Sequence, residues 1–381
     1  MKKLLYGFLG ILLLLNIAII FSGRTYLYKA VGNTYFKGRS GPSIDEFQIF
    51  ENREIKTGTP LEWSIGKDYN TKTISDSLLK QINFYKTVAF LVIKNDSVRY
   101  EKYWNNYNEN SLSNSFSMAK TFVSMLVGVA ITEGKIKSVD QPVADFLPEF
   151  KTKEKEKITI KHLLTMSSGI DFDENYSSPL AYPAQAYYGN DLRKITFQYD
   201  TKYEPGKNFN YLSGNTALLG FVLKSATGKE ISDYTSEKLW QPMGAKNAAF
   251  WSVDKKDGDE KSYCCFNSNA RDFARFGKLY LNFGKWNNQI LIDSNYVAQS
   301  VIPAELLDED GNKNEKYGYS WWLMNYKNYK IFYARGINGQ YLFCIPDLNM
   351  IVVRLGHQRA KKVGHEHPKD VYIYLDAAME M

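Results

Sequence analysis

The sequence predicts an α+β protein in which an antiparallel sheet, built from both ends of the chain and flanked by helices, is interrupted by an inserted, mainly helical lobe. Three observations carry this prediction. A β-rich hairpin pattern covers residues 87–104, helical patterns dominate residues 117–230, and short β-rich runs return between residues 317 and 356. Strands at both ends with helices between them are typical of this class. We expect any site to lie in a cleft between the two parts.

Composition sets the broad class before any element is considered. The chain has 381 residues, of which 44% are hydrophobic and 15% aromatic. This is enough for a sizeable core and is unlike disordered or fibrous proteins. The formal net charge is +7 without any basic tract, so we expect no nucleic acid as a partner. Composition leaves the oligomeric state open.

The amino terminus, residues 1–24, is predicted to be a signal anchor, with a signal peptide as the alternative. It begins with two lysines and then runs from Leu4 to Phe21 without a charge. This length lies between the apolar region of a signal peptide and the ~20 residues of a spanning helix. No small-x-small cleavage site stands out and no cysteine follows for lipid attachment. With lysines retained in the cytoplasm, the rest of the chain would be extracytoplasmic (periplasmic), in a bacterial cell envelope.

Residues 25–84 are interpreted as an extension that leads away from the membrane, and residues 85–381 as the main domain. The extension mixes polar stretches with short apolar runs and glycine-proline punctuation, and no chemistry is evident in it. The main domain opens with "TVAFLVIKNDSVRYEKYW", two β-rich runs around a polar "KNDS". Asn, Asp and Ser favour tight turns, so this stretch predicts an antiparallel hairpin.

The middle of the chain predicts a helical lobe over about residues 117–230. In "SMAKTFVSMLVGVAITEGKI" apolar residues recur at spacings of three and four, and Gly134 follows the last turn. Further helices are predicted in "ITIKHLLTMSSGI", "NTALLGFVLKSATGKEISDY" and "NARDFARFGKLYLNFG". Later, "YGYSWWLMNY", "YKIFYARG", "GQYLFCIPD" and "NMIVVRLGH" predict a β-meander, and "KDVYIYLDAAME" a closing helix.

Cysteine and histidine give little sign of chemistry. The three cysteines are too few and wrongly spaced for a disulfide framework, and adjacent Cys264 and Cys265 are interpreted as packing residues. His365 and His367 form only a two-histidine cluster near a polar tail, which is a weak signal for a metal site. We therefore expect no metal and no cofactor.

Ser117 and Lys120 are the first candidates for chemistry. They stand three residues apart at the start of the predicted buried helix, so their side chains share one face. Serine is a poor nucleophile unless a base is nearby, and a lysine that has lost its proton can serve as that base. A capping serine followed by a solvated lysine would have the same spacing, so the pair alone decides little.

The surroundings of this pair carry a family resemblance. Linked motifs follow it along the chain in the order "HLLTMSSGI", "PGKNFNYLSGNTALLG", "LWQPMGAKNAAFW", "ARDFARFGKLYLNFGKW", "YGYSWW" and "ARGINGQYLFCIPDLNMIVVRLG". Over roughly residues 86–360 this succession resembles the serine β-lactamase and penicillin-binding-protein superfamily. It is most similar to the class C β-lactamase-like hydrolases, which include esterases, D-aminopeptidases and 6-aminohexanoate-dimer hydrolases. The resemblance implies a β-lactamase/transpeptidase-like fold.

The resemblance also assigns roles, residue by residue. It implies that Ser117 is the acylated nucleophile, that Lys120 is its proton acceptor, and that Tyr211 in "NYLSGN" shuttles a proton to the leaving group. The backbone N–H groups of Ser117 and Ile337 would form the oxyanion hole. His162 recurs in this family with a structural role and is not expected to be a base.

Substrate-binding residues follow from the same resemblance, with two departures from the β-lactamase pattern. Ala334 replaces the lysine of the family's K-T-G element, while Arg335 and Gly336 follow it on the predicted cleft strand. Ser213 stands where a β-lactamase has asparagine, with Asn215 two residues later. Both departures point towards the esterase and linear-amide branch. In the tyrosine-rich loop before Tyr211, the candidates for binding are Tyr182, Tyr187 and Tyr188.

The sequence thus predicts an exported serine hydrolase that forms an acyl-enzyme with a carboxyl ester or a short linear amide or peptide. A β-lactamase or a penicillin-binding D-Ala peptidase is the first alternative. A non-catalytic cell-wall-binding module with the same fold is the second. A Ser-His-Asp hydrolase is disfavoured because no G-x-S-x-G elbow surrounds the serines considered. The membrane is expected to be contacted through residues 4–21.

Overall fold

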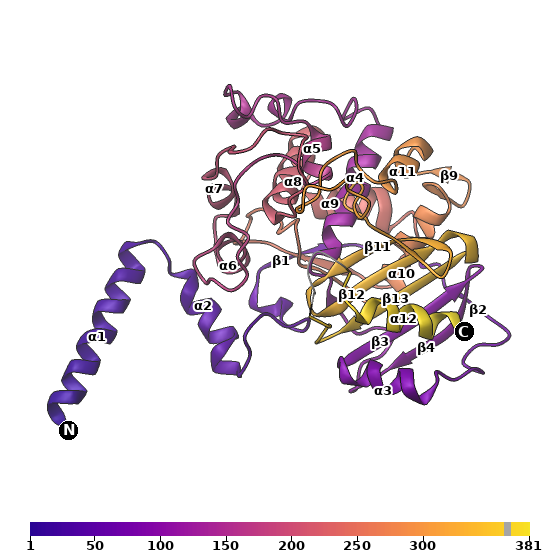
Figure 1. Cartoon of the computed structure of the whole chain (residues 1–381), viewed down its shortest axis with the longest axis horizontal. Helices are drawn as coiled ribbons and strands as arrows, with labels where there is room; N and C mark the ends of the chain where they lie inside the picture. The colour runs from indigo at the N-terminus through magenta and orange to yellow at the C-terminus, as the bar shows by residue number, and fades with distance from the viewer. Residues whose placement is uncertain (362–366) are drawn as a thin grey trace.

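The computed structural model describes residues 1–361 and 367–381, so His365 lies outside the described residues. One apolar helix projects from a globular body that holds the rest of the chain (Figure 1). The carboxyl terminus ends beside the central sheet of that body (Figure 1). Thus the amino-terminal helix alone stands clear of the body.

Helices occur along the whole described chain. They are α1 (Lys2–Phe21), α2 (Tyr26–Asn33), α3 (Asp76–Phe84), α4 (Met118–Thr132), α5 (Ile160–Leu164), α6 (Tyr182–Tyr188), α7 (Leu192–Phe197), α8 (Ser213–Thr227), α9 (Ile231–Thr235), α10 (Ala270–Leu281), α11 (Ser294–Ser300) and α12 (Asp370–Met379). The closing helix and the long helix after Ser117 are confirmed, whereas "ITIKHLLTMSSGI" forms only one short helix.

Strands occur before, within and after the helical part of the described chain. They are β1 (Asn52–Ile55), β2 (Ser64–Ile65), β3 (Thr87–Lys94), β4 (Ser97–Tyr103), β5 (Ser113–Asn114), β6 (Ala249–Ser252), β7 (Phe266–Ser268), β8 (Lys285–Trp286), β9 (Gln289–Ile290), β10 (Trp322–Tyr326), β11 (Tyr329–Gly336), β12 (Gln340–Ile345) and β13 (Met350–Gly356).

The central sheet joins both ends of the chain, as predicted. Its strand order is β10-β11-β12-β13-β3-β4-β2, and every pair is antiparallel except β2 with β4. The predicted hairpin is β3 and β4, and both turn residues, Asn95 and Asp96, have positive φ. Such φ values are required by the tight turns that match strand twist, and Asn and Asp tolerate them.

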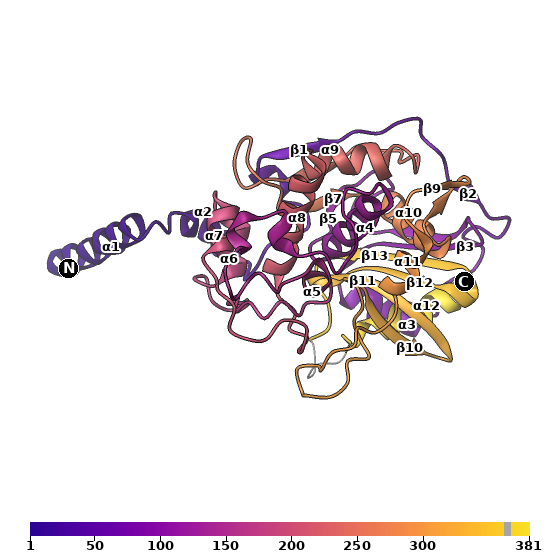
Figure 2. The same cartoon turned by 90° about the horizontal axis from the view of Figure 1, so that it is seen from above.

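Helices cover both faces of this sheet. On one face α10 packs against β3, β12 and β13, and α4 packs against β11 and β12. On the other face α3 and α12 lie together (Figure 2). The burial pattern of β3 follows from this arrangement, since Thr87 to Ile93 are all buried and only Lys94 is partly exposed. A strand covered on both faces has no solvent side on which polar residues could alternate.

The inserted lobe contains α5 to α9 and packs on α4 through α8. α4 is therefore enclosed, and its residues from Met118 to Ala130 are all buried. A second sheet of order β1-β6-β7-β5 lies at its side. No pattern in the sequence predicts this sheet, because its short strands come from three distant parts of the chain.

Residues 25–84 pack onto the main body. β1 pairs with β6, β2 pairs with β4, and α3 packs on β3 and α12. Further towards the amino terminus, α2 packs against α6 of the lobe. The segment between α2 and β1 consequently runs over the region where the lobe meets the central sheet.

Candidate active site

Ser117 lies at the turn where β5 leads into α4, as the N-cap residue of that helix. The turn is held from both sides. Phe116 N donates to Asn114 Oδ1 at 2.8 Å, and Ser115 N donates to the Phe266 carbonyl at 2.8 Å. Phe116 has a φ of +44°, a left-handed conformation that costs a bulky residue free energy. Such backbone strain is frequent at functional sites, where surrounding contacts impose it.

Lys120 is buried directly beneath Ser117. Its side chain is 1% exposed, and its Nζ lies 3.1 Å from Ser117 Oγ and 2.9 Å from the backbone oxygen of Tyr263. The spacing of three residues on one helix therefore brings amine and hydroxyl into hydrogen-bonding contact. This is the geometry that direct proton transfer between the two groups requires.

Tyr211, from the segment just before α8, approaches the same lysine. The centre of its ring is 5.2 Å from Lys120 Nζ. The ring is held by two aromatic neighbours, Trp322 at 5.3 Å and Tyr317 at 5.9 Å between ring centres. Tyr211, nearly a hundred residues along the chain from Ser117 and Lys120, is thus brought close to them at the junction of the lobe and the sheet.

A cavity of about 460 Å³ opens over Ser117. Its walls come from α2 and the segment after it, the loop that carries α6, the turn around Tyr263, and the end of β11. The predicted residues Ser213, Tyr187 and Ile337 all line it. Each described side chain on its lining is uncharged. The cavity therefore places the Ser117 hydroxyl in largely apolar surroundings.

Ser213 is held in the cavity wall by a carboxylate that the sequence analysis missed. Ser213 N donates to Glu174 Oε2 at 2.8 Å, and Ser213 Oγ donates to Glu174 Oε1. Tyr176 donates to the same carboxylate at 2.9 Å and also lines the cavity. Both residues belong to the tyrosine-rich loop, so the loop as a whole was the available signal.

The three tyrosines proposed from that loop divide between two roles. Tyr187 and Tyr188 line the cavity. Tyr182 is fully buried, shares a hydrogen bond of 3.0 Å with Thr196 Oγ1 and packs on Phe172, so it supports the lobe from within. Burial raises the pKa of Tyr187 well above that of a free phenol.

The end of β11 lies against the turn that carries the serine. A Cβ added to Gly336 would lie 2.3 Å from the Ser115 carbonyl oxygen, so only glycine permits this approach. Arg335 packs elsewhere, with its guanidinium 3.4 Å from the ring centre of Trp322. In the described part of the chain, its buried Nη1 has no hydrogen-bond partner.

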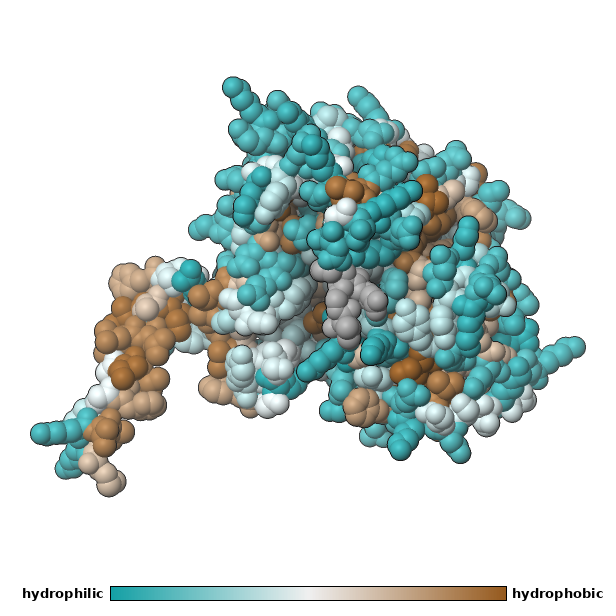
Figure 3. Space-filling model, viewed as in Figure 1, coloured by the Kyte–Doolittle hydropathy of each residue, from teal (hydrophilic) through white to brown (hydrophobic). Residues whose placement is uncertain are grey.

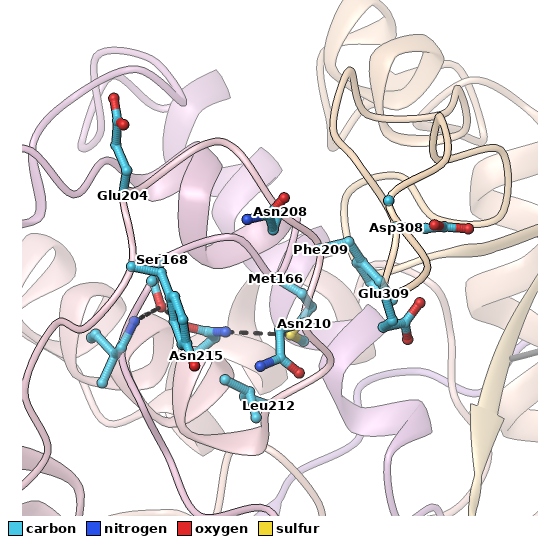
Figure 4. Close-up of a pocket in the computed structure, with 14 residues that line it drawn as sticks. Met166, Ser168, Glu204, Asn208, Phe209, Asn210, Leu212, Asn215, Asp308 and Glu309 are labelled. Carbon is cyan, nitrogen blue, oxygen red and sulfur yellow. Dashed lines mark hydrogen bonds between the residues drawn. The ribbon is translucent and has the colours of Figure 1, made fainter.

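Asn215 does not line the cavity over Ser117. Its Oδ1 accepts a hydrogen bond of 2.5 Å from Ser168 Oγ, and its Nδ2 lies 3.7 Å from the Met166 sulfur. Figure 4 shows it with these neighbours in a second cavity of about 410 Å³, which does not include Ser117. Through these contacts Asn215, near the start of α8, supports the "MSSG" segment.

Cys264 and Cys265 form a disulfide, so their interpretation as packing residues is wrong. Cys264 lines the cavity, and the preceding Tyr263 provides the carbonyl that contacts Lys120. Their adjacency was the only signal in the sequence, and adjacent cysteines are far more often unbonded neighbours than partners. His162, by contrast, has the structural place expected of it, because it closes a reciprocal cap with Thr159.

Comparison with known proteins places this geometry in a family. A family model described as "Beta-lactamase" matches residues 76–372. The chain belongs to the β-lactamase family. The fold predicted for it, β-lactamase/transpeptidase-like and α+β, is confirmed by solved structures of this kind.

Individual members of the β-lactamase family resemble the chain over most of its length. The 6-aminohexanoate-dimer hydrolase of Paenarthrobacter ureafaciens is 25% identical over 337 residues, which is 84% of this chain and 85% of the relative. A solved structure of a putative 6-aminohexanoate-dimer hydrolase from Bacillus anthracis has a TM-score of 0.76 at 22% identity and covers 88% of this chain and 92% of its own. A family VIII carboxylesterase has a TM-score of 0.65 at 16% identity, covering 84% and 98%.

Proposed function

We propose that this member of the β-lactamase family is an exported serine hydrolase that cleaves a carboxyl ester or a short linear amide through an acyl-enzyme. The observation that carries the proposal is the 3.1 Å contact between Lys120 Nζ and Ser117 Oγ at the base of the cavity. Names among the relatives agree with it, since they include a dimer hydrolase and a carboxylesterase.

The proposed acylation uses three side chains. Ser117 Oγ attacks the acyl carbon while Lys120 takes the hydroxyl proton, and the new oxyanion is bound by the N–H groups of Ser117 and Ile337. Tyr211 passes a proton to the leaving alcohol or amine as its bond to the acyl carbon breaks. Water then attacks the acyl-enzyme, its proton returns through the same groups, and Ser117 is released with the acid product.

The lining of the cavity favours neutral substrate groups. A β-lactam or a peptide ending in D-Ala carries a carboxylate, and buried carboxylates need a cation or several donors. Each described side chain of this lining is uncharged, and Ala334 takes the place of the K-T-G lysine. We therefore favour esters and linear amides without a charge near the scissile bond.

One observation keeps a β-lactamase or D-Ala peptidase as the second candidate. Arg335 presents a buried guanidinium behind Trp322, the ring on which Tyr211 packs. A small rearrangement of that ring would bring a cation to the cleft. Nitrocefin is the substrate that distinguishes this candidate from the first.

Export is proposed from α1. Lys2–Phe21 is long and apolar enough to span a bilayer, with a mean hydropathy of 2.6, and none of it is buried. A signal sequence has the same character, so α1 serves as anchor or as leader. In either case its lysines orient the helix with the catalytic body outside the cytoplasm.

The test is turnover of p-nitrophenyl butyrate and of nitrocefin by the full chain in detergent, with samples taken for intact mass after a serine-directed fluorophosphonate. We expect ester turnover with little nitrocefin turnover, one covalent adduct per chain, and loss of both turnover and adduct in Ser117→Ala. The matched control is Ser225→Ala, at an exposed serine of α8, which should behave as wild type. Rapid nitrocefin turnover would establish the second candidate. If the wild-type protein turned over neither substrate and formed no adduct, the proposed function would be wrong and a non-catalytic binding module would be favoured.

A further inference from the structure

The wall of the cavity nearest the membrane helix comes from a part of the chain outside the family match. Ala30, Thr34 and Tyr35 of α2 and the turn after it line the cavity, as does Pro42. The β-lactamase model begins only at residue 76. This wall therefore lies outside the residues that the family model matches, and it borders the space above Ser117.

Hydrogen bonds hold this wall against the rest of the cavity. Asn338 Nδ2, next to Ile337, donates to the Pro42 carbonyl at 3.0 Å. Asn114 N, just before the serine turn, donates to the Ile44 carbonyl at 2.9 Å. These two contacts join the wall, and Ile44 just beyond it, to the turn after β11 and to β5, which both lie beside Ser117.

The loop across the cavity also carries apolar side chains, beside the hydroxyl groups of Ser177 and Ser178. Pro179, Pro183 and Ala184 lie on the loop that carries α6, and Tyr26 Oη at the start of α2 donates to the Pro179 carbonyl at 3.0 Å. Together α2 and this loop enclose a slot without charged side chains among its described lining residues. Such a lining suits a hydrocarbon chain, which gains free energy by leaving water and offers no hydrogen bonds.

The wall is also attached directly to the helix that is long enough to cross a bilayer. Only the turn Ser22–Thr25 separates α1 from α2, and Tyr28 Oη of α2 donates to Asn16 Oδ1 of α1 at 2.7 Å, so α2 lies beside the end of α1. Figure 3 shows the hydrophobic surface of α1 continuing towards the body where α2 lies. The opening of the cavity is thus held within reach of the membrane surface.

Aromatic side chains mark the same stretch. Tyr35 and Phe36 are 66% and 85% exposed, at the end of α2 beside the cavity. Exposed tyrosine and phenylalanine next to a spanning helix are suited to the headgroup region, where one side of the residue meets hydrocarbon.

We propose that α2 and residues 34–42 form a binding wall for a hydrocarbon chain, and that the substrate is an amphiphilic ester or amide that enters from the membrane surface. This inference rests on the proposed function and specifies its substrate class. The acyl or alkyl chain lies between α2 and the α6 loop, with the scissile carbonyl at Ser117.

The first test compares acetyl, butyryl and octanoyl p-nitrophenyl esters with the full chain in detergent. Ala30→Trp fills the slot, so we expect kcat/KM for the octanoyl ester to fall at least tenfold while the acetyl ester changes less than twofold. Gly32→Trp is the matched control on the same helix, because a Cβ at Gly32 meets no atom within 4 Å. It should retain the wild-type profile.

Two results separate this inference from the proposed function. If Ala30→Trp lowered kcat/KM for all three esters equally, or for none of them, the wall would have no role in binding the hydrocarbon chain. Serine-dependent turnover of the acetyl ester would still support the proposed function. If Ser117→Ala retained turnover, the proposed function itself would fail. Tyr35→Ala, at an exposed position, gives a second measure: we expect a severalfold higher KM for the octanoyl ester alone.

The membrane source is tested by surface dilution. The full chain is placed in phosphatidylcholine vesicles that contain a long-chain acyl ester, and the ester's fraction in the bilayer is varied at constant total amount. We expect the initial rate to follow the surface fraction. A rate that follows only the total amount would show that the substrate is taken from water, and would overturn the membrane route.

Discussion

Lys120 illustrates how single residues determine this site. Its amine contacts Ser117 on one side and the Tyr263 carbonyl on the other, so the direction of the amine depends on the turn at residues 263–265. That turn is closed by the Cys264–Cys265 disulfide and held further by Trp251, whose Nε1 donates to the Cys264 carbonyl at 2.9 Å. The disulfide is therefore linked to the proposed catalytic lysine through a backbone carbonyl.

We predict that opening this disulfide slows catalysis more than it weakens binding. A dithiol reductant would convert the bond to two thiols, and the freed turn would let the Tyr263 carbonyl leave Lys120. A misplacement of about 1 Å can cost up to 10²-fold in rate, so we expect kcat to fall about tenfold or more with a smaller change in KM. Ester kinetics with and without dithiothreitol, and over a range of pH, measure the effect.

The Cys264→Ser/Cys265→Ser variant should show the same loss and be insensitive to reductant. Cys344→Ala is the control, because Cys344 is free and buried away from this turn; it should respond to dithiothreitol as wild type does. Unchanged kcat in the double variant would contradict the positioning role.

At the scale of elements, α6 depends on a buried lysine. Lys261 is fully buried, and its Nζ donates to the carbonyls of Ala186 at 3.2 Å and Gly189 at 3.5 Å, at the end of the helix that carries Tyr187 and Tyr188. Burial lowers the pKa of Lys261 to about 7, with Asp254 opposing this and Lys29 adding to it. The lysine thus holds one wall of the cavity in place. The free-energy cost of burying its charge depends on pH.

The sign of that dependence gives a prediction. Between about pH 7 and pH 9 the unfolded chain keeps a proton on Lys261 that the folded chain has lost, so the free energy of unfolding should rise with pH across this range. Below pH 7 both states hold the proton and this contribution stays constant. Urea unfolding at pH 6, 7, 8 and 9 measures it. Lys261→Met should remove the rise, and an unchanged slope in that variant would refute the assignment.

At the scale of the whole molecule, Arg354 on β13 joins segments from both ends of the chain. It is fully buried and donates to the carbonyls of Tyr85 at 2.6 Å, Asn338 at 2.8 Å and Gln358 at 3.0 Å. One side chain thus links the start of β3, the turn after β11 and the end of β13. The same turn holds Ile337 at the cavity.

We predict that Arg354→Met destabilises the protein by several kcal/mol. The variant leaves carbonyls buried without donors, each costing about 1–3 kcal/mol. The control is Arg99→Met, which breaks the partly exposed pair with Asp68 and a long, 3.4 Å hydrogen bond to the Lys94 carbonyl, and should cost about 1 kcal/mol or less. Urea unfolding of the three proteins tests the difference, and equal losses would show that Arg354 does not hold the ends together.

The sequence by itself determined the elements whose signals are local. The β3–β4 hairpin follows from two β-rich runs around Asn95 and Asp96, and α4 from its helical spacing and Gly134. The contact between Ser117 and Lys120 could be predicted for the same reason, because residues three apart on a helix are neighbours on its surface. The order of the motifs was sufficient to predict the family, and the family was sufficient to predict the fold.

Only the tertiary structure decided what surrounds that pair. The wall from α2, the carboxylate of Glu174 at Ser213 and the carbonyl of Tyr263 reach the site through contacts between distant segments, which no local pattern encodes. Asn215 was expected in the same cavity as Ser213. It follows Ser213 by two residues on α8 and lines a different cavity. A helix rotates about 100° per residue, so adjacent candidates face different neighbours, and packing alone selects which of them meets the substrate.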